Sequence, residues 1–209
     1  GDQSARFEYR GDDEFGQIAV TFNEMAETLN VVLSNEKLKS KYYEDKSNVD
    51  QLSGILNKAA TETLISKILD DSTDTDAHAV LIMDIDNFKS INDNFGHAAG
   101  DRVIMEVAAE LKKAFRDMDI VGRIGGDEFM VFIRHVEDIA VIREKAEHIA
   151  EAAARSSCIV ESLPDITMSI GCSRFPADGT TFRELYEKAD KALYTTKRSG
   201  KNGFTVYEA

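Results

Sequence analysis

The stretch that decides the fold is Ile120–Ile133, which reads IVGRIGGDEFMVFI. Two short runs of β-branched and aromatic residues, 120–124 and 129–133, flank a GGDE turn at 125–128. Glycine adopts positive φ without a Cβ clash, so two glycines between apolar runs predict a β-hairpin. The turn also presents two adjacent acids beside bare backbone. Acids at a turn are usually solvated turn formers, and the hairpin alone favours that interpretation.

A second acidic segment changes this interpretation. The apolar run 77–85 predicts a buried central strand that ends in Asp84-Ile85-Asp86. Placed beside the hairpin, this strand brings Asp84 close to Asp127 and Glu128. Neighbouring carboxylates raise one another's pKa unless a cation neutralises them. Two carboxylates plus substrate phosphates suit Mg²⁺, and two metals about 4 Å apart would stabilise the attacking and leaving oxygens of a phosphoryl displacement.

The predicted metal ligands are therefore Asp84 and Asp127, together with the backbone carbonyl of Ile85. Strand alternation sends Asp84 and Asp86 to the same face. For Asp86 the favoured interpretation is a cap on the short helix that follows. Lys89 stands after the acidic strand end, and Lys197, Arg198 and Lys201 cluster beside Gly200. Such cations bind phosphates or, on a solvated helix end, only complement the helix dipole.

Composition excludes several protein classes. The 209-residue chain has a net charge of −13, which argues against a general nucleic-acid binder because such a protein needs basic surface. Two cysteines, Cys158 and Cys172, imply no disulfide framework and fit a reducing compartment. No apolar run approaches the roughly 20 residues of a membrane span. The chain begins at Gly1 rather than Met, so we expect a piece of a longer protein.

The N-terminal part predicts one long helix from about residue 14 to 50. Spacings of three and four residues define a heptad seam, typical of a coiled coil, and a parallel dimer is our interpretation. A second seam follows, offset by about one residue, which would let one helical segment strain the other. The alternative is a surface helix on a globular core. The first seam consists of Phe15, Ile18, Phe22, Met25, Leu29 and Val32, and the second of Leu38, Tyr42, Val49 and Leu52.

The remainder predicts an α/β (α+β) domain. From about residue 58 the expected order is helix, strand, helices, hairpin, helix, strand, helix, strand. Thr181-x-x-Glu184 is a capping box that starts the last helix. This pattern implies a mixed, mainly antiparallel sheet flanked by helices. The expected domain boundaries are 1–32 for a relay helix, 33–52 for a coiled-coil linker and 53–209 for the globular domain.

Two resemblances follow from these motifs. Residues 13–26, with DEFG, IA, FN and MA, resemble the second helix of a HAMP domain, a helical relay found just inside bacterial membranes. Residues 50–208 resemble the GGDEF diguanylate cyclases. The motifs that carry the second resemblance are DIDNFKSIND at 84–93, GHAAGD at 96–101, RIGGDEF at 123–129, SIG at 169–171 and ADKALY at 189–194.

The GGDEF resemblance implies the fold of nucleotidyl cyclases and the polymerase palm, and an enzyme that joins two GTP into cyclic di-GMP with two Mg²⁺ (or Mn²⁺) per active site. It implies the metal ligands named above. Asn92 and Asp101 would read guanine, although Asp101 also suits a helix cap, and His97 is either near the nucleotide or a packed turn histidine. Lys89, Lys197 and Lys201 would contact phosphates, with Lys89 stabilising transition-state charge.

Two roles stay open within that resemblance. Glu128 is the candidate acceptor of the 3′-hydroxyl proton, but a hydroxyl held by the metal needs no side-chain base. Arg116 and Asp119, in an RxxD string five residues before Gly125, resemble the family's inhibitory site for cyclic di-GMP; otherwise they form an exposed helix end. Lys58 and Lys201 stand where the family commonly has Arg, so bidentate contacts are lost there.

The implied reaction needs two domains face to face, because one domain binds one GTP. The expected partners are therefore GTP, cyclic di-GMP as product and inhibitor, and a second copy held by the coiled coil, without nucleic acid. The expected location is the cytoplasmic side of a bacterial inner membrane, reached only through upstream segments. The alternatives are a domain that binds GTP or cyclic di-GMP without catalysis and a pure dimerisation module.

Overall fold

The computed structural model describes residues 11, 13–156 and 165–208, except for the side chains of 34–47, 152, 153, 155 and 156. The chain divides into two compact units, Gly1–Ser47 and Asn48–Ala209. The first unit contains α1 (Glu14–Ser47), which agrees with the predicted long helix. Leu38, Tyr42 and the predicted second seam lie largely outside the described side chains, and Cys158 lies outside the described residues. No helix in the described part of the chain is both long and apolar enough to cross a bilayer.

The first seam of α1 is open to solvent in this chain. Its members expose between 49% and 67% of their surface, which is unusual for large apolar side chains arranged in one stripe. The six residues are Phe15, Ile18, Phe22, Met25, Leu29 and Val32. The stripe is an apolar face of the helix that is exposed to solvent.

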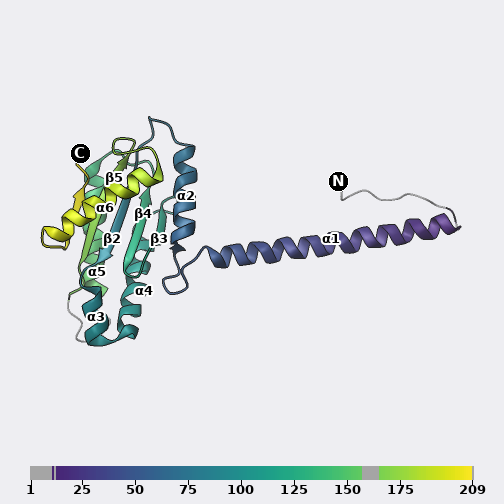
Figure 1. The fold of residues 1–209 in the computed structure, drawn as a ribbon, viewed down its shortest axis with the longest axis horizontal. Helices are drawn as coiled ribbons and strands as arrows, with labels where there is room; N and C mark the ends of the chain where they lie inside the picture. The colour runs from purple at the N-terminus through teal and green to yellow at the C-terminus, as the bar shows by residue number, and fades with distance from the viewer. Residues whose placement is uncertain (1–10, 12, 157–164, 209) are drawn as a thin grey trace. The chain divides into compact units, whose positions relative to one another are not determined.

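The second unit is a six-stranded mixed sheet with helices on both faces (Figure 1). The strand order is β1-β3-β4-β2-β5-β6, with the two outer pairs parallel and the three inner pairs antiparallel. The mixed, mainly antiparallel α+β sheet that the sequence predicts is therefore confirmed. The strands are β1 (Leu56–Asn57), β2 (His78–Ile85), β3 (Ile120–Arg123), β4 (Glu128–Ile133), β5 (Met168–Phe175) and β6 (Gly203–Val206). The helices are α2 (Lys58–Asp70), α3 (Phe88–Phe95), α4 (His97–Ala114), α5 (Ile139–Ser156) and α6 (Phe182–Arg198).

Strand β2 is the centre of the core because it is buried along its whole length. Its alternating side chains enter two separate clusters, as the pleat requires. Leu81 and Met83 pack in the cluster that includes α4 and α5, whereas Val80 and Ile82 pack in the cluster that includes α2 and α6. Asp84 continues the second series, so its side chain belongs to the α6 face.

Helix α6 lies very close to β5, and Gly171 makes this possible. A Cβ at Gly171 would stand 2.1 Å from the amide nitrogen of Leu193 and 2.2 Å from the carbonyl oxygen of Ala189. The start of the helix is fixed by the predicted capping box, in which Thr181 and Glu184 exchange backbone and side-chain hydrogen bonds. The backbone contact and the cap together set where the C-terminal end of α6 lies against the sheet.

Candidate active site

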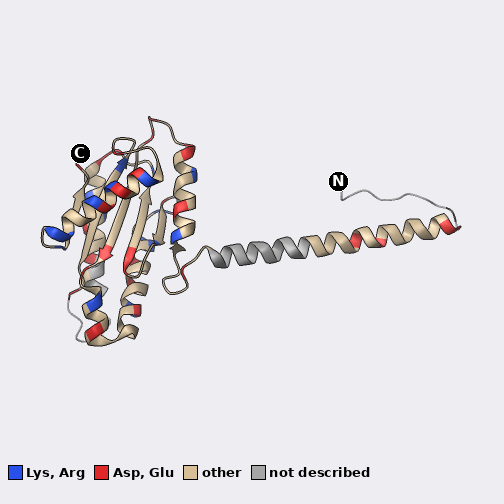
Figure 2. Cartoon of the chain, in the orientation of Figure 1, with Lys and Arg blue, Asp and Glu red and all other residues tan. Residues whose placement is uncertain are grey.

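The two acidic segments meet at one edge of the domain. Asp84 of β2 is the Cα partner of Glu128 of β4, and the amide of Ile85 donates to the Asp127 carbonyl at 3.2 Å. The sequence analysis predicted this neighbourhood from two segments more than 40 residues apart. Figure 2 shows acidic positions where β2 and β4 end, with basic positions along α6. The pairing of β2 with β4 therefore brings three carboxylates together.

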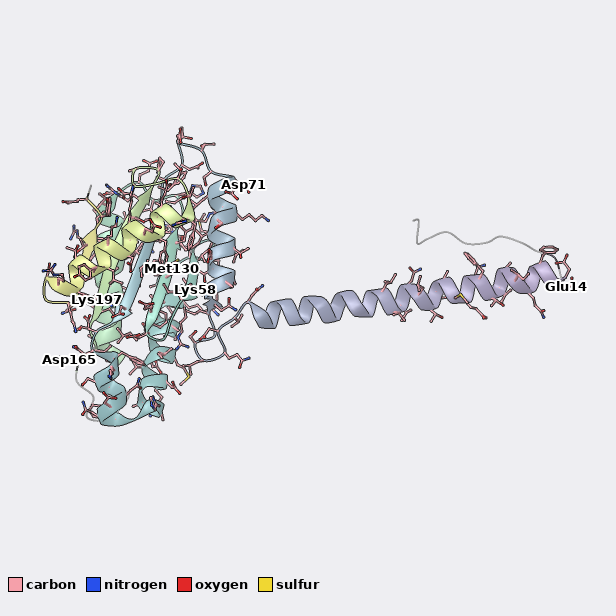
Figure 3. The ribbon with its side chains drawn as sticks, in the orientation of Figure 1. Glu14, Lys58, Asp71, Met130, Asp165 and Lys197 are labelled. Atoms are coloured by element: carbon pink, nitrogen blue, oxygen red, sulfur yellow. The ribbon has the colours of Figure 1, made fainter. Side chains whose placement is uncertain are left out.

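Lys197 is the cation that reaches this cluster. Its Nζ lies 2.7 Å from Oδ2 of Asp84, a residue that is only 8% exposed. The lysine projects from the last turn of α6 (Figure 3), the helix that Gly171 holds against β5. The predicted phosphate ligand thus forms an ion pair with a predicted metal ligand.

One lysine does not balance the negative charge. Burial raises the pKa of Asp84; Lys197 lowers it, and the charges of Asp127 and Asp86 raise it again, with a net upward shift. Burial also raises the pKa of Glu128, and Asp84 and Asp127 add to the shift against the opposing effect of Lys197. Protonation is favoured first because burial removes water from the charged carboxylates, and then because neighbouring carboxylates repel one another. A bound divalent cation would relieve this repulsion.

The donor chemistry fits Mg²⁺ or Mn²⁺. The predicted ligands, the Asp84 and Asp127 carboxylates and the Ile85 carbonyl, are hard oxygen donors, and the two carboxylates carry the unbalanced charge that such ions need. Within the described ranges no group of three or more His, Cys, Asp or Glu side chains is placed to hold a metal ion by itself. Substrate phosphates would supply the remaining ligands, as is usual for Mg²⁺.

Arg123 fixes the acidic turn, and the sequence analysis did not single it out. Its Nε and Nη2 donate to the carbonyls of Gly125 and Gly126 at 2.7–3.1 Å, and Nη1 donates to Asp50 at 2.8 Å. Burial would raise the pKa of Asp50, but hydrogen bonds from Ser53 and Arg123 outweigh it and hold this pKa below its usual value. The guanidinium therefore ties the turn to the segment that enters the domain.

Asp86 does not cap the following helix, so that prediction is wrong. The N-cap position of α3 is Asn87, which makes no side-chain capping bond. The buried Asp86 carboxylate instead accepts hydrogen bonds from the hydroxyls of Thr167 and Ser169 and from the amide of Asn202. These partners are distant in sequence, so a local capping argument could not find them.

The residues predicted to read guanine lie on the two helices that follow β2. Asn92 of α3 covers Gly100 of α4, where a Cβ would stand 2.1 Å from Asn92 Oδ1. His97 is the first residue of α4 and is exposed. Asp101 is also exposed and lies inside the helix rather than at its start, so the helix-cap alternative for Asp101 is wrong. Lys89 is exposed on α3.

The predicted inhibitory pair lies elsewhere, at the end of α4. Asp119 is 9% exposed, and its two oxygens accept the backbone amides of Arg116 at 3.1 Å and Arg134 at 3.0 Å. Arg116 is exposed and lines a cavity of about 330 Å³ that also includes Lys112 and Asp117. Asp119 therefore fixes the local backbone, while Arg116 and Lys112 supply cations to the cavity.

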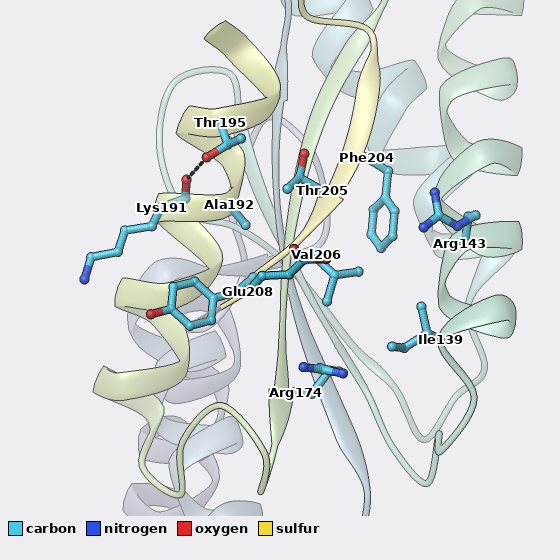
Figure 4. Close-up of a pocket in the computed structure, with 11 residues that line it drawn as sticks. Ile139, Arg143, Arg174, Lys191, Ala192, Thr195, Phe204, Thr205, Val206 and Glu208 are labelled. Atoms are coloured by element: carbon cyan, nitrogen blue, oxygen red, sulfur yellow. Dashed lines mark hydrogen bonds between the residues drawn. The ribbon is translucent and has the colours of Figure 1, made fainter. Parts of the chain in front are cut away.

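One well-formed cavity lies away from the acidic cluster. It measures about 620 Å³ and lies beside β6, between α5 and α6 (Figure 4). Arg143 covers the ring of Phe204 there at 5.5 Å, and Arg174 is paired with Asp178. None of the predicted site residues lines it.

Comparison with known proteins agrees with this geometry. Residues 47–203 match the family model described as "Diguanylate cyclase, GGDEF domain", and residues 1–31 match the HAMP domain model. The chain is 34% identical over 163 residues to the bifunctional diguanylate cyclase/cyclic di-GMP phosphodiesterase MucR of Pseudomonas aeruginosa, covering 77% of this chain and 23% of that protein. It is 39% identical over 129 residues to diguanylate cyclase A of Treponema denticola, covering 61% and 34%.

The fold has solved relatives as well. The structure of the coiled coil and GGDEF domain of DgcB from Caulobacter crescentus, in complex with c-di-GMP, superposes with a TM-score of 0.75 at 25% identity, covering 87% of this chain and 98% of that one. The chain spans between 23% and 34% of the length of the two curated relatives above. Since the family model covers most of the chain and the sheet has the matching fold, this chain belongs to the GGDEF diguanylate cyclase family.

Proposed function

We propose that this chain condenses two GTP into cyclic di-GMP and two pyrophosphates. The observation that carries the proposal is the cluster of Asp84, Asp127 and Glu128, whose excess negative charge is met by a single lysine. Such a cluster suits a polyphosphate–metal complex because the metal neutralises the acids and the phosphates bind the lysine. Membership of the GGDEF family supports GTP as the nucleotide.

In this proposal, different residues around the cluster bind the metal ions, the phosphates and the guanine base. Asp84, the Ile85 carbonyl and Asp127 would hold two Mg²⁺ (or Mn²⁺), which supply charge neutralisation to the reacting oxygens. Lys197 leaves Asp84 to bind phosphate. Lys201, in the turn after α6, and Lys89, on α3, add positive charge. Asn92 and Asp101 bind the guanine base, because an ionised carboxylate accepts hydrogen bonds from the adjacent N–H groups on guanine's Watson–Crick edge. His97, exposed at the start of α4, lies beside the nucleotide.

The chemical step is an in-line displacement. The 3′-oxygen of one GTP forms a bond to the α-phosphorus of the other, and the bond from that phosphorus to pyrophosphate breaks. Glu128 accepts the 3′-hydroxyl proton. Glu128 is the carboxylate of the cluster that the proposed metal ligands, Asp84 and Asp127, leave available for this role.

The reaction requires a second copy of the chain, because each domain presents one GTP. The exposed seam of α1 supports a parallel coiled-coil homodimer, since a second helix would bury it. Positioning dominates phosphoryl transfer. We therefore propose that residues 1–32 form half of a HAMP relay, 33–52 a linker helix and 53–209 the catalytic domain, within a membrane-anchored parent whose catalytic part is cytoplasmic. Shifts of the helix would then set the distance between the half-sites.

A non-catalytic binding domain is the main alternative. The retention of both Asp127 and Glu128, next to Asp84, favours the enzyme, because binding alone needs no basic carboxylate at the reacting oxygen. We also propose product inhibition at the cavity lined by Arg116, where guanidinium and ammonium groups suit the phosphates of cyclic di-GMP. Asp119 contributes there by holding the backbone of Arg116.

Replacing Glu128 by Gln tests the proposed reaction. We expect the wild-type chain, given GTP and Mg²⁺, to form cyclic di-GMP and pyrophosphate. Removal of the base should lower the rate by about 10²–10⁴-fold while binding of α,β-methylene-GTP is retained. Glu187→Gln is the control, because Glu187 is a carboxylate paired with Arg183 outside the cluster. A wild-type chain that binds GTP without forming product would contradict the function; an undiminished Glu128→Gln rate would contradict only the role of that residue.

Charging the α1 seam tests the dimer. Ile18→Glu with Met25→Glu places four like charges per dimer in the seam without lowering helix propensity. We expect a monomer by sedimentation and a rate lowered by more than about tenfold, because the second half-site is missing. Val20→Glu with Val31→Glu is the matched control, since both valines are more than half exposed but lie off the seam. A monomeric seam variant with full activity would refute the requirement for this helix.

Replacing Arg116 by Ala tests product inhibition. The initial rate should stay unchanged, whereas the cyclic di-GMP concentration for half inhibition should rise by more than about tenfold, because a guanidinium–anion contact is lost. Lys113→Ala is the control, since Lys113 pairs with Glu110 and does not line the cavity. Asp119→Ala should instead lower the free energy of unfolding by about 1–3 kcal/mol, because two backbone amides lose their acceptor. Equal inhibition of the Arg116 and Lys113 variants would exclude this site.

A further inference from the structure

Asp86 is a buried carboxylate that has no part in the chemistry proposed above. It is 5% exposed and stands directly after β2. Its Oδ1 accepts the Ser169 hydroxyl at 2.6 Å, and its Oδ2 accepts the Thr167 hydroxyl at 2.7 Å and the Asn202 amide at 2.9 Å. All three donors are uncharged. A carboxylate kept out of water by neutral donors alone needs a reason for its presence, because a neutral acceptor would be easier to bury.

The Asn202 amide belongs to an unusual turn between α6 and β6. Gly200, Lys201 and Asn202 have φ values of +115°, +65° and +45°, so three successive residues are left-handed. Two of them carry a Cβ, which makes this conformation unfavourable without support. The Lys201 amide donates to the Thr196 carbonyl at 3.1 Å, and the next amide donates to Asp86. The Asp86 carboxylate thus supports the turn from the β2 side.

The neighbour of Asp86 holds the side chain of the same turn. Lys201 Nζ donates to Oδ1 of Asn87 at 2.6 Å, and Asn87 is itself left-handed with φ at +57°. Residues 86 and 87 therefore contact residues 202 and 201, respectively, across the end of the sheet. Ser169 of β5 lies between β2 and β6 at this end of the sheet, because it is the Cα partner of both Asp84 and Gly203.

We infer that Asp86 is a positioning residue that aims Lys201 at the nucleotide phosphates. The inference rests on the proposed function, which makes Lys201 a phosphate ligand. Asp86 touches no substrate in this account; it acts through the Asn202 amide, which fixes the backbone from which Lys201 projects. A charged acceptor holds that amide more strongly than a neutral one, which explains why a carboxylate occupies the position. The Thr167 and Ser169 hydroxyls orient it.

A double-mutant cycle tests this inference. Affinity for α,β-methylene-GTP with Mg²⁺ is measured by calorimetry for the wild type, Asp86→Ala, Lys201→Met and the double variant. We expect each single variant to bind about tenfold more weakly, and the double variant to bind no more weakly than Lys201→Met. Asp86→Asn, which keeps one oxygen acceptor, should fall between Asp86→Ala and the wild type. If Asp86→Ala does not fold, Asp86→Asn takes its place in the double-mutant cycle. Fully additive losses would overturn the inference.

The control separates positioning from general destabilisation. Asp178→Ala removes another buried carboxylate, which binds the Arg174 backbone and guanidinium away from the cluster. This variant should lower the free energy of unfolding without lowering the affinity for the analogue. In the nucleotide-free protein, the Asn202 amide resonance should move upfield in Asp86→Ala and stay in place in Asp178→Ala. Equal analogue affinity in the wild type and Asp86→Ala would contradict this inference alone, whereas a wild type that binds no analogue would overturn it together with the proposed function.

Discussion

The candidate site depends on the burial of neighbouring carboxylates where β2 and β4 meet. Asp84 and Glu128 are cross-strand partners, and like charges directly opposite each other destabilise a sheet. The fold tolerates the arrangement because Lys197 approaches Asp84 to 2.7 Å, yet the pKa values of both acids stay raised. A domain selected only for stability would not retain this arrangement. Its retention is understandable if a cation and phosphates complete the site.

Several features of the fold hold the acidic cluster and Lys197 in position. Gly171 lets α6 contact the β5 backbone, which sets the position of Lys197 at the C-terminal end of that helix. Arg123 donates hydrogen bonds to the carbonyls of the acidic turn and links them to Asp50 at the entrance of the domain. The edges of the sheet are formed by the short strands β1 and β6, so the acidic cluster lies on the central strands. These contacts fix the positions of the backbone segments that carry the acidic cluster and Lys197.

Much of this could be predicted from the sequence, because the signals were local. The glycine pair predicted the hairpin, the apolar run predicted β2, and the capping box of Thr181 and Glu184 predicted the start of α6. The errors came from non-local contacts. Asp86 was read as a helix cap, but its side-chain partners lie 81, 83 and 116 residues away. Gly100 lies within α4, where the lack of a Cβ leaves room for the Asn92 side chain of α3. Strand β1, with two residues, is too short to show any periodicity.

The central claim is that Asp84 and the hairpin acids bind a divalent ion together with a guanosine triphosphate. Mn²⁺ tests it most directly, because free and bound Mn²⁺ are distinguished by electron paramagnetic resonance without any turnover. The wild-type chain is titrated with Mn²⁺ in the presence of α,β-methylene-GTP. The Asp84→Asn variant is titrated in the same way, and the analogue without protein serves as the reference. The account predicts that the wild type removes the free Mn²⁺ signal well beyond the analogue alone and that Asp84→Asn largely loses this excess. Equal Mn²⁺ binding by the two proteins would contradict it.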